Sequence, residues 1–170
     1  MSGVATFEIR DATAADHPAI LALNLASERM LSPMDAAQLR ELDAQSTFHR
    51  VVQEGSEVVA FLLALREGAG YDSPNYRWFA ERYDTFLYID RVVVASAWHG
   101  RGVGRRLYEE LFAFARAGGI GTIACEFYLQ PPNEASRRFH ARMGLHQVAT
   151  QWLPGGIKQV SLQVASSSAG

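Results

Sequence analysis

The sequence has one cysteine, no long apolar run and no large excess of charge of either sign. Cys125 stands alone in 170 residues, so no internal disulfide can form, and no Cys/His spacing indicates a zinc site. The formal net charge of −2 at pH 7 provides no overall attraction to nucleic acid. No stretch approaches the about 18 uncharged apolar residues that a membrane-spanning helix needs, and the N-terminus lacks the pattern of a secretory signal. We therefore expect a cytoplasmic protein with no metal and with neither a nucleic-acid nor a membrane partner.

The composition is that of one folded domain. Hydrophobic residues make up 48% of the chain, which is enough to bury one core in a chain of this size. Residues 166–170 are small and polar, a composition typical of a tail that frays. These features predict a single domain over residues 1–165 followed by a disordered tail at 166–170.

Hydrophobic periodicity and turn residues predict a mixture of strands and helices. Capping residues favour helices that begin near Asp16 and near Asp35. Residues 67–85 contain two glycines, a proline and then an aromatic stretch, which favours an ordered crossover. Two further helices are predicted at 102–117 and 133–143, and strands at 7–10, 48–54, 58–66, 86–94, 122–129, 146–153 and 158–164.

The segment His-Gly-Arg-Gly-Val-Gly-Arg at 99–105 places three glycines on alternate positions between a predicted strand and a predicted helix. Backbone N–H groups at a helix N-terminus are unpaired donors with a partial positive charge, and glycines let an anion approach them closely. The pattern favours a phosphate or pyrophosphate site, although a tight turn with solvated arginines would need the same residues.

Two nucleotide-binding motifs fit this segment poorly. A dinucleotide fingerprint spaces its glycines G-x-G-x-x-G, with an acidic residue about 20 positions later. Here the spacing is G-x-G-x-G, and position 124 is alanine. A P-loop needs Gly-Lys-Ser/Thr at the helix start, whereas this chain has Gly104-Arg105-Arg106.

Two linked motifs resemble those of the GNAT superfamily of acyl-CoA-dependent N-acyltransferases. Residues 92–104 are similar to its phosphate motif, Gln/Arg-x-x-Gly-x-Gly/Ala after an apolar strand, with His99 in the Gln/Arg position and Ser96 where proline is common. Residues 133–145 resemble its second motif, Asn-x-x-Ala-x-x-Phe-Tyr and then Gly-Phe. There Ser136 replaces alanine, His140 replaces tyrosine and Leu145 replaces phenylalanine.

The resemblance implies an α/β (α+β mixed) GNAT-like fold. Its central sheet would be mixed, mostly antiparallel, splayed between the strands at 86–94 and 122–129, and flanked by about four helices. Acetyl-CoA would lie in that gap as the cosubstrate, with its pyrophosphate on the glycine loop and its pantetheine arm along the first strand. The residues implied for it are Val92, Val93, Val94, His99, Gly100, Arg101, Gly102, Val103, Gly104, Arg105, Asn133, Ser136 and Phe139.

Three side chains are candidates for the chemistry of acyl transfer to an amine. Glu126 lies in an apolar strand, where burial raises the pKa of a carboxyl group toward that of a useful base; a buried ion pair with an arginine is the alternative. Asp90, which strand alternation places on the same face as Tyr88, is a second candidate base. His140 occupies the position of the family's tyrosine acid and can donate a proton near neutral pH, or it can serve structure alone. Cys125 alternates with Glu126, and we expect it to pack in the core.

The acceptor site is predicted in the aromatic and acidic segment 71–84. Five aromatics and three acids there could hold an ammonium or an aromatic amine, and the alternative is a helix that packs its aromatic residues on the sheet. The residues assigned to the acceptor are Asn24, Tyr76, Trp78 and Tyr88.

The sequence thus predicts an enzyme that moves an acetyl group from acetyl-CoA directly to a primary amine of a small molecule or a peptide. A non-catalytic acyl-CoA-binding module and a nucleotide-binding α/β domain are the competing hypotheses. Members of the family often form homodimers, and no feature of the sequence marks an interface. The identity of the acceptor amine, the acyl-chain length and the choice of base stay open at this point.

Overall fold

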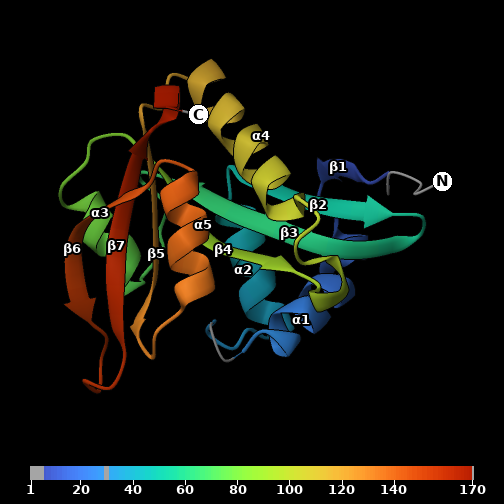
Figure 1. The fold of residues 1–170 in the computed structure, drawn as a ribbon, viewed down its shortest axis with the longest axis horizontal. Helices are drawn as coiled ribbons and strands as arrows, with labels where there is room; N and C mark the ends of the chain where they lie inside the picture. The colour runs from blue at the N-terminus through green and yellow to red at the C-terminus, as the bar shows by residue number, and fades with distance from the viewer. Residues whose placement is uncertain (1–5, 29–30, 170) are drawn as a thin grey trace.

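The computed structural model describes residues 6–28 and 31–169. Its strands and helices follow the predicted order (Figure 1). The strands are β1 Glu8–Asp11, β2 Phe48–Glu54, β3 Glu57–Arg66, β4 Leu87–Val94, β5 Thr122–Gln130, β6 His146–Trp152 and β7 Gln159–Ser166. The helices are α1 His17–Ala26, α2 Ala36–Gln45, α3 Pro74–Ala80, α4 Val103–Ala117 and α5 Glu134–Arg142, with single 3-10 turns at Ala14–Asp16, Ser96–Trp98 and Ser167–Ala169.

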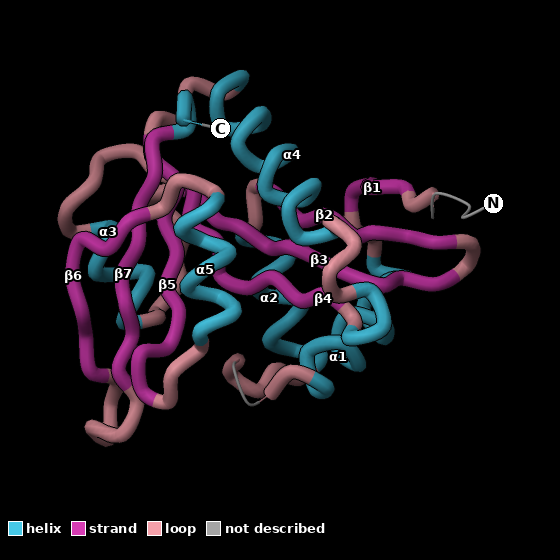
Figure 2. The backbone as a smooth tube through the Cα atoms, viewed as in Figure 1, coloured by secondary structure: helices cyan, strands magenta, loops and turns pink. Residues whose placement is uncertain are grey.

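One seven-stranded sheet, in the order β1-β2-β3-β4-β5-β7-β6, runs through the molecule. All neighbouring strands are antiparallel except β4 and β5, which are parallel. Their parallel ladder holds only two residue pairs, Leu87 with Ile123 and Tyr88 with Ala124. Beyond these pairs the two strands run apart (Figure 2). The predicted mixed, mostly antiparallel and splayed sheet is confirmed.

Helices cover both faces of the sheet and enclose a separate apolar cluster on each. In the view of Figure 1, α4 and α5 lie in front of the sheet and α1, α2 and α3 lie behind it. Val103, Leu107 and Leu111 of α4 are buried on the front face. Ile20 of α1 and Phe79 of α3 are buried on the rear face. Because each helix presents one apolar stripe to the sheet, the two clusters fix the positions of the helices that border the gap between β4 and β5.

The capping signals read from the sequence form as predicted at the start of α2. The Asp35 side chain accepts a hydrogen bond from the backbone N–H of Gln38 at 2.8 Å, and the Gln38 side chain accepts one from the backbone N–H of Asp35 at 2.9 Å. Reciprocal bonds of this kind satisfy donors that a helix start leaves open. They fix the entry to α2 directly after the loop that leads from α1.

The five α-helices among the described residues agree with the about four that were expected, and α3 lies within the segment expected as a crossover. The expectation for the tail needs correction. The tail expected to be disordered is ordered over 166–169: β7 includes Ser166, and the N–H of Ser167 donates to the carbonyl of Gly121 at 3.0 Å. The Ser167 carbonyl in turn accepts from Arg116 at 2.9 Å, so backbone bonds hold a segment whose composition suggested fraying. Residue 170 lies outside the described residues.

No helix among the described residues is long and apolar enough to cross a bilayer. Within the same residues, no group of three or more His, Cys, Asp or Glu side chains could hold a metal ion.

A buried histidine lies on the side of the molecule away from α4. His49 of β2 has its Nδ1 2.6 Å from Oδ1 of Asp43, and its Nε2 is buried without a hydrogen-bond partner in the described structure. Burial lowers the pKa of His49 below its ordinary value of 6.5, and the partial compensation by Asp43 does not reverse the shift. The unfolded chain therefore binds a proton near pH 6 that the folded chain resists, so stability falls as the pH drops below 6.5.

Replacing this histidine should reduce the acid sensitivity of the fold. We expect the fall in the urea midpoint between pH 7.5 and pH 5.5 to be smaller in His49→Gln than in the unchanged protein. The substitution itself should cost about 1 kcal/mol at pH 7.5, because the bond to Asp43 is weakened. His146→Gln, at an exposed position, is the control. An equal fall in the urea midpoint in His49→Gln and in the unchanged protein would contradict the assignment of this acid sensitivity to His49.

Candidate active site

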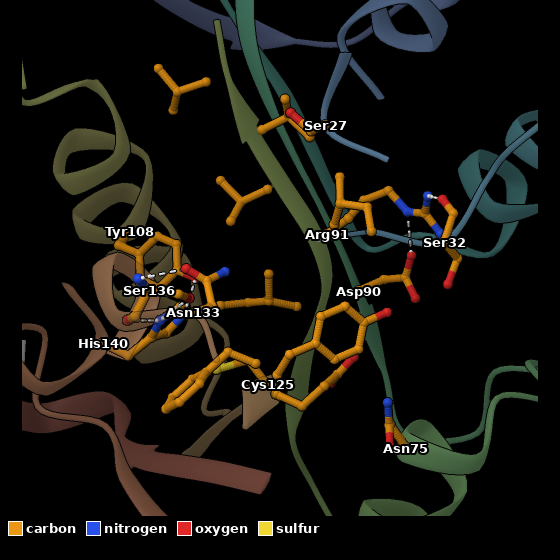
Figure 3. A pocket seen from close by; sticks show the side chains of 18 of the residues that line it. Ser27, Ser32, Asn75, Asp90, Arg91, Tyr108, Cys125, Asn133, Ser136 and His140 are labelled. Carbon is orange, nitrogen blue, oxygen red and sulfur yellow. Dashed lines mark hydrogen bonds and ion pairs between the residues drawn. The ribbon is translucent and has the colours of Figure 1, made fainter. Parts of the chain in front are cut away.

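A cavity of about 420 Å³ opens where β4 and β5 separate, and its wall combines residues from both strands with residues of the loop after α1 and of α5 (Figure 3). A larger groove of about 1030 Å³ runs beside it along the start of α4. Five residues line both spaces, which therefore form one continuous site: Val92, Val94, His99, Ser136 and His140.

The groove is bounded by the glycine loop and the N-terminus of α4. Gly100 and Gly102 have φ values of +76° and +79°, a conformation that glycine adopts without strain. A Cβ built on Gly102 would meet nothing within 4 Å, so open space lies directly against the loop. Because the first amides of α4 also lack helical partners, the groove has the donors and the room that an anionic group requires.

The side chains predicted for the cofactor lie in this site with one exception. Gly100, Gly102, Val103, Gly104, Arg105 and Phe139 line the groove, and Val93 and Asn133 line the cavity. Arg101 instead lies with its guanidinium 4.8 Å from the centre of the Trp98 ring. His99, in the Gln/Arg position of the motif, lies 2.7 Å through Nε2 from the carbonyl of Val94, which can only accept. It therefore caps the end of β4.

Glu126 reaches the cavity from β5, on the side opposite α5. The hydroxyl of Tyr88 on β4 lies 2.8 and 2.7 Å from its two carboxylate oxygens, so this contact spans the gap just where the strands part. Burial raises the pKa of Glu126 to about 8, with a further increase from Asp90, while hydrogen bonds from Tyr88 and Asn75 and the charge of Arg91 act in the opposite direction. The carboxyl group is therefore poised to exchange a proton near neutral pH.

Asp90 and Arg91 form a buried ion pair in the middle of β4. The Nε of Arg91 donates to Oδ2 of Asp90 at 2.8 Å, and the two side chains are 6% and 4% exposed. The second oxygen of Asp90 accepts from the hydroxyl of Tyr71 at 2.5 Å. The pairing of β3 and β4 is irregular here, with Leu63 opposite Arg91 and Ala64 opposite Ile89. This β-bulge interrupts alternation, so Asp90 and Arg91 turn to the same side as Tyr88.

Arg91 also fixes the opposite wall of the cavity. Its Nη1 donates to the Asn24 side chain at 2.8 Å and to the carbonyl of Ser32 at 3.2 Å, and the amide of Asn24 donates to that same carbonyl. These bonds connect β4 to the C-terminal part of α1 and to the chain leading into α2. Ser27 and Ser32 of this segment line the cavity, as Figure 3 shows.

His140 is paired with Tyr108 at the junction of cavity and groove. Its Nδ1 lies 2.7 Å from the carbonyl of Ser136, which can only accept, so Nδ1 carries the hydrogen. Burial lowers the pKa of His140, and its Nε2 therefore accepts from the hydroxyl of Tyr108 at 2.8 Å. In this neutral form the hydrogen nearest to the cavity belongs to Tyr108 and not to the histidine.

Cys125 matches its expectation of burial. Its side chain belongs to the apolar cluster beneath α4 and also borders the cavity. Burial raises the pKa of its thiol well above the ordinary value, with a further increase from Glu126. A thiol held in its protonated form is a poor nucleophile, which agrees with direct transfer.

The residues predicted for the acceptor play mainly structural parts. The hydroxyl of Tyr76 donates to the carbonyl of Arg66 at 2.7 Å, and its ring is buried among aromatic neighbours. Trp78 packs under the guanidinium of Arg82 at 4.2 Å. Asn24 is buried against Arg91, and Tyr88 touches the site only through its contact with Glu126. The helical alternative for this segment, α3 with its aromatic residues on the sheet, is the arrangement observed.

Sequence reasoning missed two residues that shape the site, Arg91 and Tyr108, and did not single out Asn75 within the predicted acceptor segment 71–84. A charged Asp-Arg pair inside an apolar strand could have marked Arg91, but the bulge that orients it leaves no sequence signal. Asn75 lines the cavity and accepts from Gln151 at 3.0 Å, which links α3 to β6. Tyr108 occupies an apolar-face position of α4, where a tyrosine is usually a core residue.

Comparisons with known proteins agree with this geometry. The model of the GNAT family of acetyltransferases matches residues 9–145. The ribosomal-protein-S18-alanine N-acetyltransferase of Escherichia coli superimposes with a TM-score of 0.71 and 13% identity, over 95% of this chain and 94% of that one. Ard1 of Thermoplasma volcanium superimposes with a TM-score of 0.76 and 15% identity, over 94% of this chain and 97% of that one. Arabidopsis thaliana NAA60, in complex with a bisubstrate analogue, superimposes with a TM-score of 0.75 and 15% identity, over 95% of this chain and 98% of that one. No curated protein matches the chain.

The glycine loop can be tested without disturbing the fold. A Cβ added at Gly104 would lie in the groove, 3.6 Å from the Phe139 ring and 3.9 Å from the Val94 side chain, both ordinary contacts. We expect Gly104→Ala to keep or raise the unfolding free energy, by up to about 1 kcal/mol, because alanine favours the helix. The same methyl narrows the groove, and acetyl-CoA should bind about 10-fold more weakly, equivalent to about 1.4 kcal/mol.

Calorimetric titration with acetyl-CoA and thermal unfolding measure the two effects separately. Gly121→Ala is the matched control, since a Cβ there meets nothing within 4 Å and the position is outside the groove. Unchanged affinity in Gly104→Ala would place the ligand elsewhere.

Proposed function

Since the chain belongs to the GNAT family of acetyltransferases, we propose that it transfers an acetyl group from acetyl-CoA directly to a primary amine of a small molecule or a peptide, with Glu126 as the general base. The observation that carries this proposal is the position of Glu126 in the gap between β4 and β5, where its carboxyl group faces the cavity and its pKa lies at about 8. Two of the solved relatives are N-acetyltransferases by name, and two others are in complex with bisubstrate analogues.

Acetyl-CoA fits the groove by chemistry and by shape. The amides at the start of α4, with Gly100 and Gly102 beside them, would hold the pyrophosphate, and Arg105 lines the same space. The pantetheine arm would follow β4 past Val92 and Val94, because beyond Tyr88 this edge of β4 has no strand partner among the described residues. The thioester would then end in the cavity, between Glu126 and the Tyr108–His140 pair.

The residues of the cavity can carry out each part of the transfer. Ionised Glu126 accepts the proton that the amine loses as its nitrogen bonds to the thioester carbon. Backbone amides of β4 near Val92 and Val94 would stabilise the oxyanion that forms. When the carbon–sulfur bond breaks, the Tyr108 hydroxyl turns its hydrogen away from Nε2 of His140 and donates it in a hydrogen bond to the departing thiolate. Glu126 releases its proton to solvent as the products leave, which balances the reaction.

Asp90 is better suited to positioning than to catalysis. Both of its oxygens already accept hydrogen bonds, from Arg91 and from Tyr71, so neither is available to take a proton from the acceptor. Of the two predicted bases, Glu126 is therefore the one that we assign. A homodimer and a cytoplasmic location stay predictions.

Thiol release separates an enzyme from a non-catalytic acyl-CoA-binding module. The purified protein is incubated with acetyl-CoA and a panel of amines and peptides, and free CoA is measured between pH 6.5 and pH 9. We expect release that depends on one class of acceptor. A protein that binds acetyl-CoA but releases no thiol above the hydrolysis blank with any amine would be a binding module.

The pH profile of kcat tests Glu126. Because the folded pKa of this carboxyl is about 8, kcat should rise with pH through that value as the base ionises. Glu126→Gln cannot ionise, so we expect kcat to fall by about 100-fold or more and the rise attributed to Glu126 to disappear. Glu57→Gln, at an exposed position outside the site, is the control. A variant that keeps the full pH profile would exclude Glu126 as the base.

Tyr108→Phe tests the hydrogen bond to the leaving group. Removing the hydroxyl should lower kcat by about 10-fold, equivalent to about 1.4 kcal/mol, and leave the dissociation constant of acetyl-CoA unchanged. The double variant with His140→Gln should be no slower than the slower single variant, because the two side chains act as one unit. Tyr83→Phe, on the segment after α3, serves as the matched tyrosine control. Normal turnover in Tyr108→Phe would leave the pair a structural role only.

A further inference from the structure

The acceptor end of the cavity holds two carboxylic acids, and neither provides a free negative charge. The carboxyl group of Asp90 is paired with Arg91, whose Nε lies 2.8 Å from one oxygen, and the Tyr71 hydroxyl donates to the other. The Tyr88 hydroxyl lies 2.8 and 2.7 Å from the two oxygens of Glu126 and can donate its hydrogen to one of them. Burial raises the pKa of Glu126 to about 8, so most molecules carry this carboxyl group uncharged at pH 7. The described wall therefore has no surplus anion at neutral pH.

Other titratable groups of the wall do not supply the missing negative charge. Burial raises the pKa values of Tyr108 and Cys125 well above their ordinary values, so both remain uncharged. His99 and His140 can only add positive charge. Lys158 places its ammonium 5.3 Å from the ring centre of Tyr128, which lines the cavity. Lys158 therefore adds a positive charge near this side of the cavity.

This charge distribution disfavours the entry of an ammonium ion. An ion that leaves water needs an opposite charge in the protein, and a neutral amine does not. A lysine side chain or an alkylamine has a pKa of about 10.4, whereas an α-amino group has a pKa of about 7.7–8.0. At pH 7 the uncharged fraction of an α-amine is therefore roughly several hundred times larger than that of a lysine side chain, which is about the ratio of their two acidity constants.

We propose that the acceptor is an α-amino group, carried by a peptide N-terminus or by an amino-acid derivative, and not the side-chain amine of lysine or a polyamine. This inference rests on the proposed acetyl transfer. The neutral α-amine enters without a counter-ion, its nitrogen bonds to the acetyl carbon as the bond to sulfur breaks, and its proton goes to the ionised fraction of Glu126.

Matched acceptors test the proposal in the unchanged protein. The tripeptide amide Ala-Gly-Gly offers only an α-amine, its N-acetylated Lys-Gly-Gly counterpart offers only an ε-amine, and alaninamide offers an α-amine without a peptide. We expect kcat/KM at pH 7 to be at least about 100-fold higher for Ala-Gly-Gly than for the ε-amine. Above pH 8 this ratio should narrow by about tenfold per pH unit, because only the ε-amine still gains uncharged molecules.

Each outcome has a distinct meaning. Preference for the ε-amine, or a ratio that does not change between pH 7 and pH 9.5, would overturn the proposal while leaving acetyl transfer intact. Absence of transfer to every amine, in protein that binds acetyl-CoA, would instead overturn the proposed function. Equal use of alaninamide and Ala-Gly-Gly would assign the α-amine to small amino-acid derivatives, and preference for the tripeptide would assign it to peptide N-termini.

A charge reversal at the mouth gives a second, independent measurement. Lys158→Glu, at an exposed position, should raise kcat/KM for the ε-amine about 3-fold relative to the α-amine, and added salt should reduce the gain. Arg40→Glu changes the net charge equally, on exposed α2 outside the cavity wall, and should leave the ratio unchanged. Equal effects of the two variants would show that the mouth does not discriminate by charge.

Discussion

The separation of two parallel strands is the constraint on which the site depends. β4 and β5 share only two residue pairs, at Leu87 with Ile123 and Tyr88 with Ala124, and then diverge. Each strand stays in the sheet through its other neighbour, β3 or β7. The diverging edges leave backbone groups without strand partners, which a ligand lying along β4 could pair. The same separation makes the cavity, because side chains of the two strands meet only at its closed end.

The polar contacts at the closed end connect the two halves of the sheet across the gap. Tyr88 of β4 reaches Glu126 of β5 directly after the last paired residues, and Asn75 of α3 approaches the same carboxyl. On the other side Arg91 joins β4 to Asn24 and Ser32. A buried ion pair is weak evidence for stability by itself, since its desolvation offsets most of its attraction. Here the bonds place charged groups at fixed positions on both walls of the cavity.

The sequence predicted the sheet and the glycine loop but not the acceptor end. Strands, hairpins and the helix after the loop follow from period-two and period-3.6 patterns and from capping residues, which are local signals. The assignment of Gly100, Gly102 and Gly104 likewise needs only the adjoining strand and helix. Arg91 depends on a bulge, and Tyr108 on a pairing with His140 that lies 32 positions away. Such contacts depend on tertiary packing. Strand alternation correctly predicted that Asp90 lies on the same face as Tyr88, but it could not predict that Arg91 lies on that face as well.

The environments of Asp90 and Glu126 separate the roles of two similar carboxyl groups. Asp90 has a guanidinium at 2.8 Å and serves as the fixed counter-charge of Arg91. Glu126 has only neutral donors in contact, Tyr88 and Asn75, and burial dominates its pKa. The negative charge of Asp90 also opposes ionisation of Glu126, so the structural pair contributes to the tuning of the base. Two acids in such different surroundings can divide positioning from proton transfer within one cavity.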